Sequence, residues 1–400
     1  MRWGLFVLRV RCLIMALDPI FAPTVLLPKV SDLSKWAVIA CDQFTAQPEY
    51  WETLTDLVGE APSSLRFILP EVWLDERLES APAEIRDAMN QALAADMFEP
   101  REGYILVERT LKSGEKRLGL MANLALEDYE YTPSNQARIK ATEATVPDRL
   151  PPRAAIRSAA PLEMPHVLVL LNDPESQVIE TLYQRREKFE QLYDFELNMN
   201  GGHIRGWLVP EEFGFPTADL VGLERDGVLA LIGDGNHSLA AAKLTGDTSA
   251  LVELVNIHSP AIEFEPIHRI VVGAGPEFVV DFKAAIKGPA STQLYFDGEK
   301  QAVAIPANPA DAIADVQQFI DDYAKHNDII VDYIHGDDEL IAIADRLSDN
   351  DKNAVAIFLP AIDKNTLFDY TARRGVLPRK AFSIGHAEDK RYYLELAHRN

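Results

Sequence analysis

The stretch from Gly233 to Ser238 holds four kinds of reactive group within six residues. Its order, Gly-Asp-Gly-Asn-His-Ser, places a carboxylate, an amide, an imidazole and a hydroxyl beside two glycines. Gathered at one point, such groups can hold an anion, because the amide, the imidazole and the hydroxyl all donate hydrogen bonds. The candidate site residues of this stretch are Gly233, Asp234, Gly235, Asn236, His237 and Ser238.

The residues on either side predict the elements that position this stretch. The apolar run 228–232 is typical of a short buried strand, and 238–244, which contains Ala-Ala-Ala-Lys, favours a helix. A strand, a glycine turn and a helix start would aim backbone N–H groups and the positive helix end at one point. The competing interpretation is a structural turn in which Asp234 caps the helix and His237 lies in the core.

A second candidate segment is Pro266-Ile267-His268-Arg269, which directly precedes the apolar residues 270–272. Arginine is the side chain best suited to clamp a phosphate or a carboxylate through two parallel hydrogen bonds. We therefore expect His268 and Arg269 to help hold an anionic ligand. A surface turn with an ordinary ion pair is the alternative.

A third candidate lies within 129–161, where prolines interrupt any regular period. Glu143 can act as a general base toward a substrate hydroxyl, and Arg149, Arg153 and Arg157 can hold phosphates. The composition fits a binding loop as well as a linker. A solvated charged loop is the other interpretation.

Charge and composition limit the classes of function. The net charge is −23, from 62 acidic and 39 basic residues, which argues against general nucleic-acid binding but leaves room for a small basic pocket. The two cysteines cannot build a disulfide framework and lack metal-ligand spacing. We expect a cytoplasmic protein with no membrane partner, and assembly as a homo-oligomer stays open.

The first fourteen residues differ from the rest. Residues 1–14 carry three arginines, no acid and an apolar run interrupted too early for a signal peptide. We expect this segment to be a mis-assigned start or a disordered extension, with Met15 as the true beginning.

A chain of 400 residues is too long for one ordinary core, so two domains are expected. Strand and helix patterns alternate through its middle, as in an α/β layer. We expect an α/β (α+β) fold with a mixed sheet core, a core unit at 15–275 and a C-terminal α/β lobe at 276–400. The patterns also predict a strand at 36–41, an amphipathic helix at 175–193 and a β-hairpin at 103–124.

Five motifs, taken together, resemble a known family. They are the segments 36–51 (beginning Trp-Ala-Val-Ile-Ala-Cys-Asp-Gln), 141–145 (Ala-Thr-Glu-Ala-Thr), 233–238, 266–269 and 377–380 (Leu-Pro-Arg-Lys). Their identity and order are similar to the bacterial and archaeal family of unknown function numbered 1015, over nearly the whole chain from Met15 onward.

The turn itself also resembles the nucleotide-binding box of the ParB/sulfiredoxin-like superfamily, which includes free-serine kinases. Asp234, Gly235 and His237 match that box, and an Ala-rich helix follows. The resemblance implies that nucleotide phosphates lie at the helix start. Ser238 stands where that superfamily usually has an arginine, so the turn must take its cation from Arg269 or from the 149–157 loop.

These observations predict a nucleotide-dependent phosphotransferase that acts on a small hydroxylated metabolite, with free L-serine as the specific hypothesis. The expected cofactor is ATP or ADP with Mg²⁺. Asp234 would hold Mg²⁺ or orient the hydroxyl, Glu143 would be the base and Arg269 would stabilise the transferred phosphoryl group, with His237 beside the phosphates. Further cofactor contacts are expected from Gly233, Gly235, Asn236, Ser238, His268 and Arg153.

Two other functions remain open. One is a non-catalytic module that senses a nucleotide or a metabolite, which the serine at position 238 favours. The other is a ParB-like protein that associates with DNA, against which the net charge of −23 argues.

Overall fold

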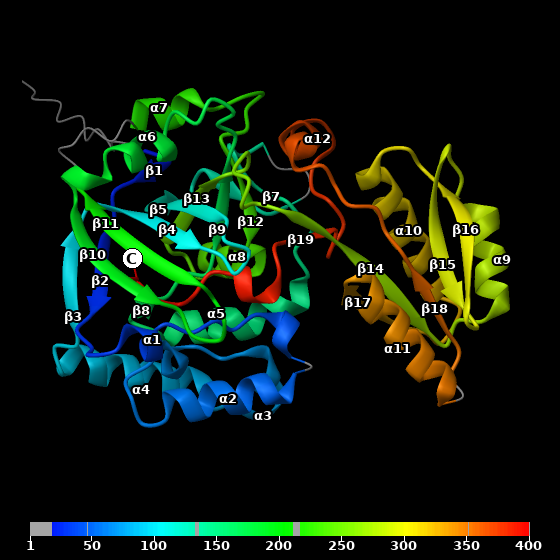
Figure 1. The fold of residues 1–400 in the computed structure, drawn as a ribbon, viewed down its shortest axis with the longest axis horizontal. Coiled ribbons are helices and arrows are strands. Elements are labelled where there is room, and N and C mark those ends of the chain that lie inside the picture. Colours follow the sequence, from blue (N-terminus) through cyan, green and yellow to red (C-terminus); the bar gives the residue numbers. More distant parts are fainter. Residues whose placement is uncertain (1–17, 46, 133–135, 211–216, 351, 400) are drawn as a thin grey trace, which may run out of the picture.

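Two β-sheets organise the chain into a larger and a smaller lobe (Figure 1). The computed structural model describes residues 18–45, 47–132, 136–210, 217–350 and 352–399. The expected N-terminal extension, residues 1–14, lies outside the described residues. Within the described ranges, every helix is too short or too polar to cross a lipid bilayer.

The larger lobe is built on a ten-stranded mixed sheet. The order is β10-β11-β4-β5-β13-β9-β12-β7-β6, with β1 pairing β5. Both β12–β7 and β13–β9 are parallel pairs, whereas β12–β9 is antiparallel. The strands are β1 (Ile20–Phe21), β4 (Tyr104–Thr110), β5 (Lys116–Ala125), β6 (Tyr129–Glu130), β7 (Ile139–Ala141), β9 (Leu168–Leu171), β10 (Glu190–Glu196), β11 (His203–Val209), β12 (Ala230–Asp234) and β13 (Ser249–Asn256).

Helices cover both faces of this sheet. Successive residues of a strand point to opposite faces, so a strand of mostly apolar residues contributes to a core on each side. Along β4, Ile105 and Val107 join the core under the N-terminal helices, whereas Leu106 joins the core under α6. Figure 1 shows α1 to α5 along one side of the lobe and α6 and α7 on the other. The helices are α1 (Leu33–Trp36), α2 (Pro48–Val58), α3 (Leu74–Arg77), α4 (Ala81–Ala94), α5 (Leu150–Ala159), α6 (Ile179–Gln184), α7 (Thr217–Gly222) and α8 (Asn236–Leu244).

The smaller lobe has its own sheet, of order β16-β15-β18-β14-β17. Phe278 and Ile313 pack one face through α9 and α10, and Leu340 packs the other face through α11. The elements are β14 (Phe264–Val272), α9 (Pro276–Ala285), β15 (Ala290–Phe296), β16 (Glu299–Ile305), α10 (Pro309–Ala324), β17 (Ile330–His335), α11 (Asp337–Asp349) and β18 (Ala354–Ile357).

The C-terminal segment returns to the larger lobe after α12 (Leu367–Arg374) (Figure 1). There β19 (Phe382–Ile384) pairs with the start of β14, and β20 (Ala397–His398) pairs with β8 (Leu162–Glu163). A small sheet of β2 (Thr24–Pro28) and β3 (Phe98–Glu102) lies nearby, and Leu26 forms a bridge to Leu396. The residues after 384 therefore belong to the larger lobe in space.

Buried ion pairs anchor this returning segment. Arg391 pairs with Glu253 at 2.8 Å and with Glu395 at 2.5 Å, and Tyr193 donates to Glu395 at 2.6 Å. Arg109 donates to backbone carbonyls at 389 and 390, at 3.0 Å and 2.5 Å. The network holds the segment in place because an unpaired buried charge would cost several kcal/mol (about 3–5).

The expected mixed-sheet α/β class and the hairpin at 103–124 are confirmed. The expected division at residue 275 differs from the sheet pairing. Strand β14 precedes residue 275 but belongs to the smaller sheet, and the segment 385–398 lies in the larger lobe. Each lobe therefore contains residues from both sides of the expected boundary.

Two local predictions are wrong, and a third segment contains a helix where a loop was expected. In place of the strand expected at 36–41, Trp36 is the last residue of α1. Val38 then forms a single bridge to Tyr393, because the C-terminal segment covers these buried residues. The expected helix at 175–193 shrinks to α6 and gives way to β10, whose alternating side chains pair with β11. The proline-rich loop contains α5, since two of its prolines lie in the first helical turn, which tolerates them.

Candidate functional site

One cavity of about 550 Å³ gathers most of the expected site residues. Its lining includes all six residues from Gly233 to Ser238, together with Glu143 and Arg153. The walls come from the β12–α8 turn, α5, β17 of the smaller lobe and the C-terminal segment. A volume in this range suits a small molecule the size of a nucleotide.

The β12–α8 turn has the backbone geometry that a ligand at a helix start requires. Gly235 precedes the helix with a φ of +82°, a conformation that favours glycine, and α8 begins at Asn236 with no side chain capping it. A Cβ at Gly235 would lie 2.8 Å from Val167 Cγ2, so only glycine fits. The first backbone N–H groups of α8 therefore have no side-chain cap, and groups arranged in this way can bind an anion.

The side chains of the turn fix its shape. Asp234 Oδ1 accepts from the Gly235 N–H at 2.8 Å, and Asn236 Oδ1 accepts from the Thr142 N–H at 3.3 Å. His237 Nε2 accepts from the Val146 N–H at 3.0 Å, which requires the imidazole to be neutral at that nitrogen. The competing interpretation, Asp234 as a helix cap and His237 in the core, does not match these contacts or the lining of the cavity.

Lys390 supplies a cation to the turn, although no motif in its local sequence marks it. Its Nζ lies 3.4 Å from Asp234 Oδ2 and donates to Ser383 Oγ at 2.8 Å and to the Ile384 carbonyl at 2.9 Å. The lysine is 8% exposed, whereas the Asp234 side chain is one-third exposed, at 34%. Lys390 comes from the returning C-terminal segment, so only the tertiary fold brings it here.

The cavity is locally basic in an acidic chain. Its lining has seven Lys and Arg residues and four Asp and Glu residues, while the whole chain has a net charge of −23. The basic residues are Arg149, Arg153, Arg157, Arg379, Lys380, Lys390 and Arg391. Such a local excess of positive charge attracts an anionic ligand.

These basic residues differ in how firmly they are already paired. Arg157 is committed to Glu163 and Asp247, both at 2.5 Å, and serves the structure of the wall. Arg153 pairs with Glu71 at 2.8 Å, and Arg149 reaches the same carboxylate only at 3.8 Å. Arg149 and Arg153 are therefore better placed than Arg157 to meet a ligand.

Arg269 does not line the cavity, contrary to expectation. It is fully buried on β14, where it donates to Gln317 Oε1 at 2.9 Å and to the carbonyls of Ile267 and Lys380 at 2.7 Å and 2.9 Å. Its guanidinium also lies over the Tyr333 ring, with Cζ 4.5 Å from the ring centre. With its donors used in this way, Arg269 cannot clamp a phosphoryl group directly.

His268 is also separate from the cavity. Only 2% of it is exposed, its Nδ1 accepts from the Leu359 N–H at 3.0 Å, and its Nε2 lies 2.8 Å from Asp337 Oδ1. Burial lowers the pKa of His268, with Asp337 acting in the opposite direction. His268, expected to contact the cofactor, therefore lies outside the lining of the cavity.

Glu143 lines the cavity, but its carboxylate is engaged. It accepts from the backbone N–H groups of Lys380, Ala381 and Phe382, at 3.1, 2.9 and 3.4 Å. Burial raises the pKa of Glu143, while the Lys380 charge and these N–H donors act to lower it. The three donors already occupy the carboxylate oxygens, so the geometry leaves Glu143 poorly placed to reach a substrate hydroxyl as the expected general base.

Glu143 and Arg269 both hold the same segment through hydrogen bonds to its backbone. This segment, residues 377–382, is here called the 377–382 loop, and its Lys380 has a φ of +55°, which is unusual for a residue with a side chain. Arg269 donates to the Lys380 carbonyl while Glu143 accepts from the N–H groups that follow. Together they fix the loop that presents Arg379 and Lys380 to the cavity.

A family model described as "Protein of unknown function (DUF1015)" matches residues 25–323. The chain belongs to this family. No curated protein matches the sequence. The resemblance expected from the five motifs is thus confirmed over most of the chain, and the family's description assigns no activity.

Three solved structures are similar to this DUF1015 chain at low identity. A conserved hypothetical protein from Pyrococcus furiosus is 14% identical, covers 68% of this chain and 90% of its own, and has a TM-score of 0.37. A free serine kinase in complex with AMP is 12% identical, with coverages of 66% and 96% and a TM-score of 0.41. SbnI with a C-terminal truncation, from Staphylococcus aureus, is 9% identical. It covers 66% of this chain and 82% of its own, with a TM-score of 0.38. Scores below 0.5 do not establish a shared activity.

Two further residues of this DUF1015 cavity carried no sequence signal. His166 precedes β9 and Tyr393 lies in the C-terminal segment, and both line the cavity beside Ser238. Neither belongs to a motif with recognisable spacing. The buried tyrosine and the histidine become candidates only because the fold places them at the start of α8.

Proposed function

We propose that this protein binds a nucleotide in the cavity and transfers a phosphoryl group to a small hydroxylated metabolite. The observation that carries the proposal is the basic cavity at the uncapped start of α8, in a chain of net charge −23. Backbone N–H groups of a helix start and nearby cations are the groups that bind phosphates.

The first groups in this proposal bind and orient the nucleotide. The backbone N–H groups of Asn236, His237 and Ser238 hold phosphate oxygens, and Lys390, Arg149 and Arg153 neutralise their charge. Phosphoryl transfer depends mainly on positioning and electrostatic stabilisation, which such a cavity can supply. Arg269 acts as a positioning residue through the 377–382 loop.

Asp234 acts in this proposal near the phosphate that is transferred. Its carboxylate, one-third exposed in the cavity, can orient the substrate hydroxyl or bind Mg²⁺ that arrives with the nucleotide. Mg²⁺ is commonly held by one or two carboxylates together with substrate phosphates, and it neutralises phosphate charge when bound. Within the described residues no group of three or more His, Cys, Asp or Glu could hold a metal on its own.

Turnover assays test the activity. The protein is incubated with ATP or ADP, Mg²⁺ and a panel of hydroxylated metabolites, with L-serine first, and nucleotide consumption and phosphorylated product are followed by chromatography. The proposal predicts product that depends on both the nucleotide and one hydroxylated substrate. Failure of every substrate, with no nucleotide binding by calorimetry, would exclude it.

A second function is favoured by one observation. Glu143, the carboxylate expected to act as the general base, is already held by three backbone N–H groups. A non-catalytic nucleotide-binding module would need no such base. A protein that binds nucleotide in calorimetry and is stabilised by it in a thermal-shift assay, yet never consumes it, would fit this second function.

A further inference from the structure

A chain of hydrogen bonds runs from the start of α8 to the C-terminal segment. Ser238 Oγ lies 3.2 Å from His166 Nε2, and His166 Nδ1 lies 2.8 Å from the Tyr393 hydroxyl. All three side chains line the same cavity. A hydroxyl, an imidazole and a third group that orients the imidazole form the arrangement by which enzymes activate a serine nucleophile.

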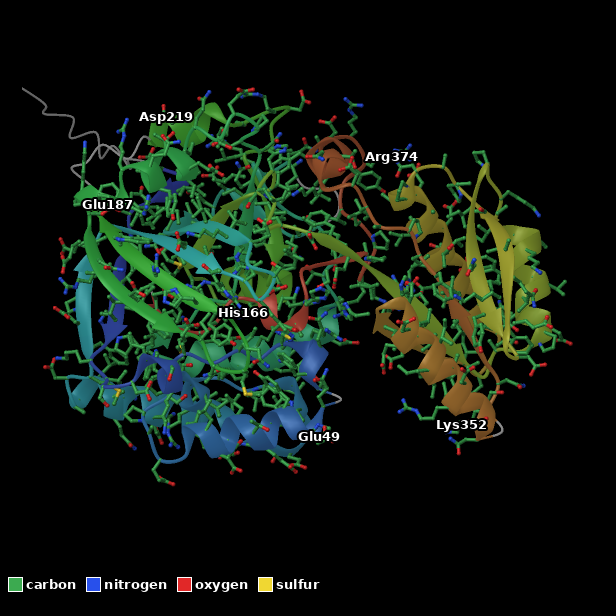
Figure 2. The ribbon with its side chains drawn as sticks, viewed as in Figure 1. Glu49, His166, Glu187, Asp219, Lys352 and Arg374 are labelled. Carbon is green, nitrogen blue, oxygen red and sulfur yellow. The ribbon has the colours of Figure 1, made fainter. Side chains whose placement is uncertain are left out.

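Each member of this chain is held by a different part of the fold. Ser238 lies in the first turn of α8, His166 lies just before β9, and Tyr393 is fixed by its backbone N–H donating to the Val38 carbonyl at 2.8 Å. Figure 2 labels His166 within the larger lobe, beside the C-terminal segment. Tyr393 is 8% exposed, and burial raises its pKa, which keeps the hydroxyl neutral.

The side chain of Ser238 is not used by its own helix. A serine that caps a helix lies just before its first residue, whereas Ser238 lies within the first turn of α8 and its Oγ faces His166. In the tautomer with the proton on Nδ1, the imidazole donates to the Tyr393 oxygen and Nε2 accepts from the serine hydroxyl. This places an acceptor for the serine proton within hydrogen-bond distance.

We propose that Ser238 accepts a phosphoryl group from the bound nucleoside triphosphate, with His166 as the base and Tyr393 as a positioning residue. The Ser238 Oγ–P bond forms as the bond between the γ-phosphorus and the β,γ-bridging oxygen breaks. The nucleoside diphosphate leaves, and the serine proton moves to His166 Nε2. This inference rests on the proposed function, because it needs nucleotide phosphates at the start of α8.

The product of this step suits its surroundings. A phosphoserine in the first turn of a helix is stabilised by the positive helix end and by nearby cations. Arg153 and Lys390 both line the cavity. A hydroxylated substrate would then take the phosphoryl group, its oxygen bonding to phosphorus as the Ser238 Oγ–P bond breaks. The substrate hydroxyl gives its proton to the Asp234 carboxylate, which releases it to solvent, and the proton on His166 returns to Ser238 Oγ.

The test measures the phosphoenzyme and nucleotide binding on the same preparations. The full-length protein is incubated with radiolabelled ATP and Mg²⁺, quenched in acid and analysed by mass spectrometry for phosphoserine, and ADP affinity is measured by calorimetry. Thr245→Ala is the matched control, because Thr245 is a hydroxyl residue at the other end of α8 and does not line the cavity.

The expected result is a phosphoserine at position 238 in the wild type and in T245A, and none in S238A. His166→Asn should slow its formation about 100-fold or more, the usual scale for losing a general base. Tyr393→Phe should slow it about 10-fold, the scale of one hydrogen bond, without changing the ADP affinity. A purely structural tyrosine would not separate these two readouts.

Two outcomes would overturn the inference and are distinguishable. ADP binding or ATP-dependent turnover without any phosphoserine at position 238 would refute the serine acceptor and leave the proposed function standing. Absence of nucleotide binding in the correctly folded wild type would refute both. A phosphoserine at 238 that forms equally fast in H166N would refute the role of His166.

Discussion

Lys390 and Asp234 lie 3.4 Å apart, between Nζ and Oδ2, at the start of helix α8. Their pairing completes a turn that has a carboxylate but no cation of its own in the local sequence. Because the lysine is almost fully buried and the carboxylate faces the cavity, the pair defines the position where phosphate charge would be neutralised.

Replacing Lys390 by methionine should weaken ADP binding by about 10- to 100-fold, the cost of one hydrogen bond to a charged group. The side chain keeps its length, and Asp234 keeps partial exposure, so the fold should persist. Isothermal titration calorimetry gives the affinity. The matched control is Lys352→Ala, an exposed lysine at the far end of the smaller lobe (Figure 2). Equal affinities for K390M and wild type would contradict the assignment.

Gly235→Ala should impair both the turn and the ligand position. The alanine Cβ would lie 2.8 Å from Val167 Cγ2, and the φ of +82° disfavours a side chain by about 1–2 kcal/mol. Gly246 has the same φ but open space around it, so Gly246→Ala is the control. Chemical denaturation should show a stability loss in both, while only G235A should lose nucleotide binding. Normal binding by G235A would refute the predicted phosphate position.

Arg269→Lys should destabilise the protein although the charge is retained. The fully buried guanidinium donates to several carbonyl and amide oxygens that a lysine cannot reach together, and the expected cost is about 3 kcal/mol. Urea unfolding measures it, with Arg373→Lys on the exposed surface of α12 as the control. A loss below about 0.5 kcal/mol would mean that the 377–382 loop does not depend on Arg269.

Glu143→Gln separates a base from a positioning residue. The contacts to the 377–382 loop predict a lower ADP affinity, because the amide offers one acceptor oxygen where the carboxylate offered two. They also predict about 1–2 kcal/mol lower stability. The measurements are calorimetry and urea unfolding. A large fall in kcat with unchanged affinity and stability would instead identify Glu143 as the general base.

The burial of His268 should make the free energy of unfolding depend on pH. Burial lowers its pKa from the ordinary value of 6.5, so the unfolded chain takes up the proton before the folded chain does. The stability that neutral His268 contributes is therefore complete above pH 6.5 and is lost as the pH falls below it. Urea unfolding measures the free energy of unfolding at pH 7.5 and at pH 5.5. The fall in this free energy from pH 7.5 to pH 5.5 should be larger in the wild type than in His268→Gln. An equal fall in both proteins would contradict the prediction.

The sequence was sufficient to predict structure where the polar residues and the strand and helix that position them are adjacent in the chain. The apolar run before Gly233 and the alanines after Ser238 predicted the strand, the turn and the helix that the structure has. The hairpin of β4 and β5 was predictable for the same reason, since its pattern and its turn residues are adjacent.

The remainder depends on contacts between distant segments. Lys390, His166 and Tyr393 carry no motif. The return of the C-terminal segment brings Lys390 and Tyr393 to α8, and the pairing of β9 with β12 brings His166 there. Arg269 was expected at the ligand because arginine suits phosphates, but the sequence does not reveal that carbonyls of the 377–382 loop occupy its donors. Burial of a charged residue is a tertiary property, which its local sequence does not determine.

The central claim is that nucleotide phosphates bind at the start of α8, and a crystal structure with ADP and Mg²⁺ tests it most directly. The account predicts phosphate oxygens within hydrogen-bond distance of the backbone N–H groups of Asn236, His237 and Ser238 and close to Lys390 Nζ. Density for ADP elsewhere on the protein, with this turn still in contact only with its present neighbours, would contradict it.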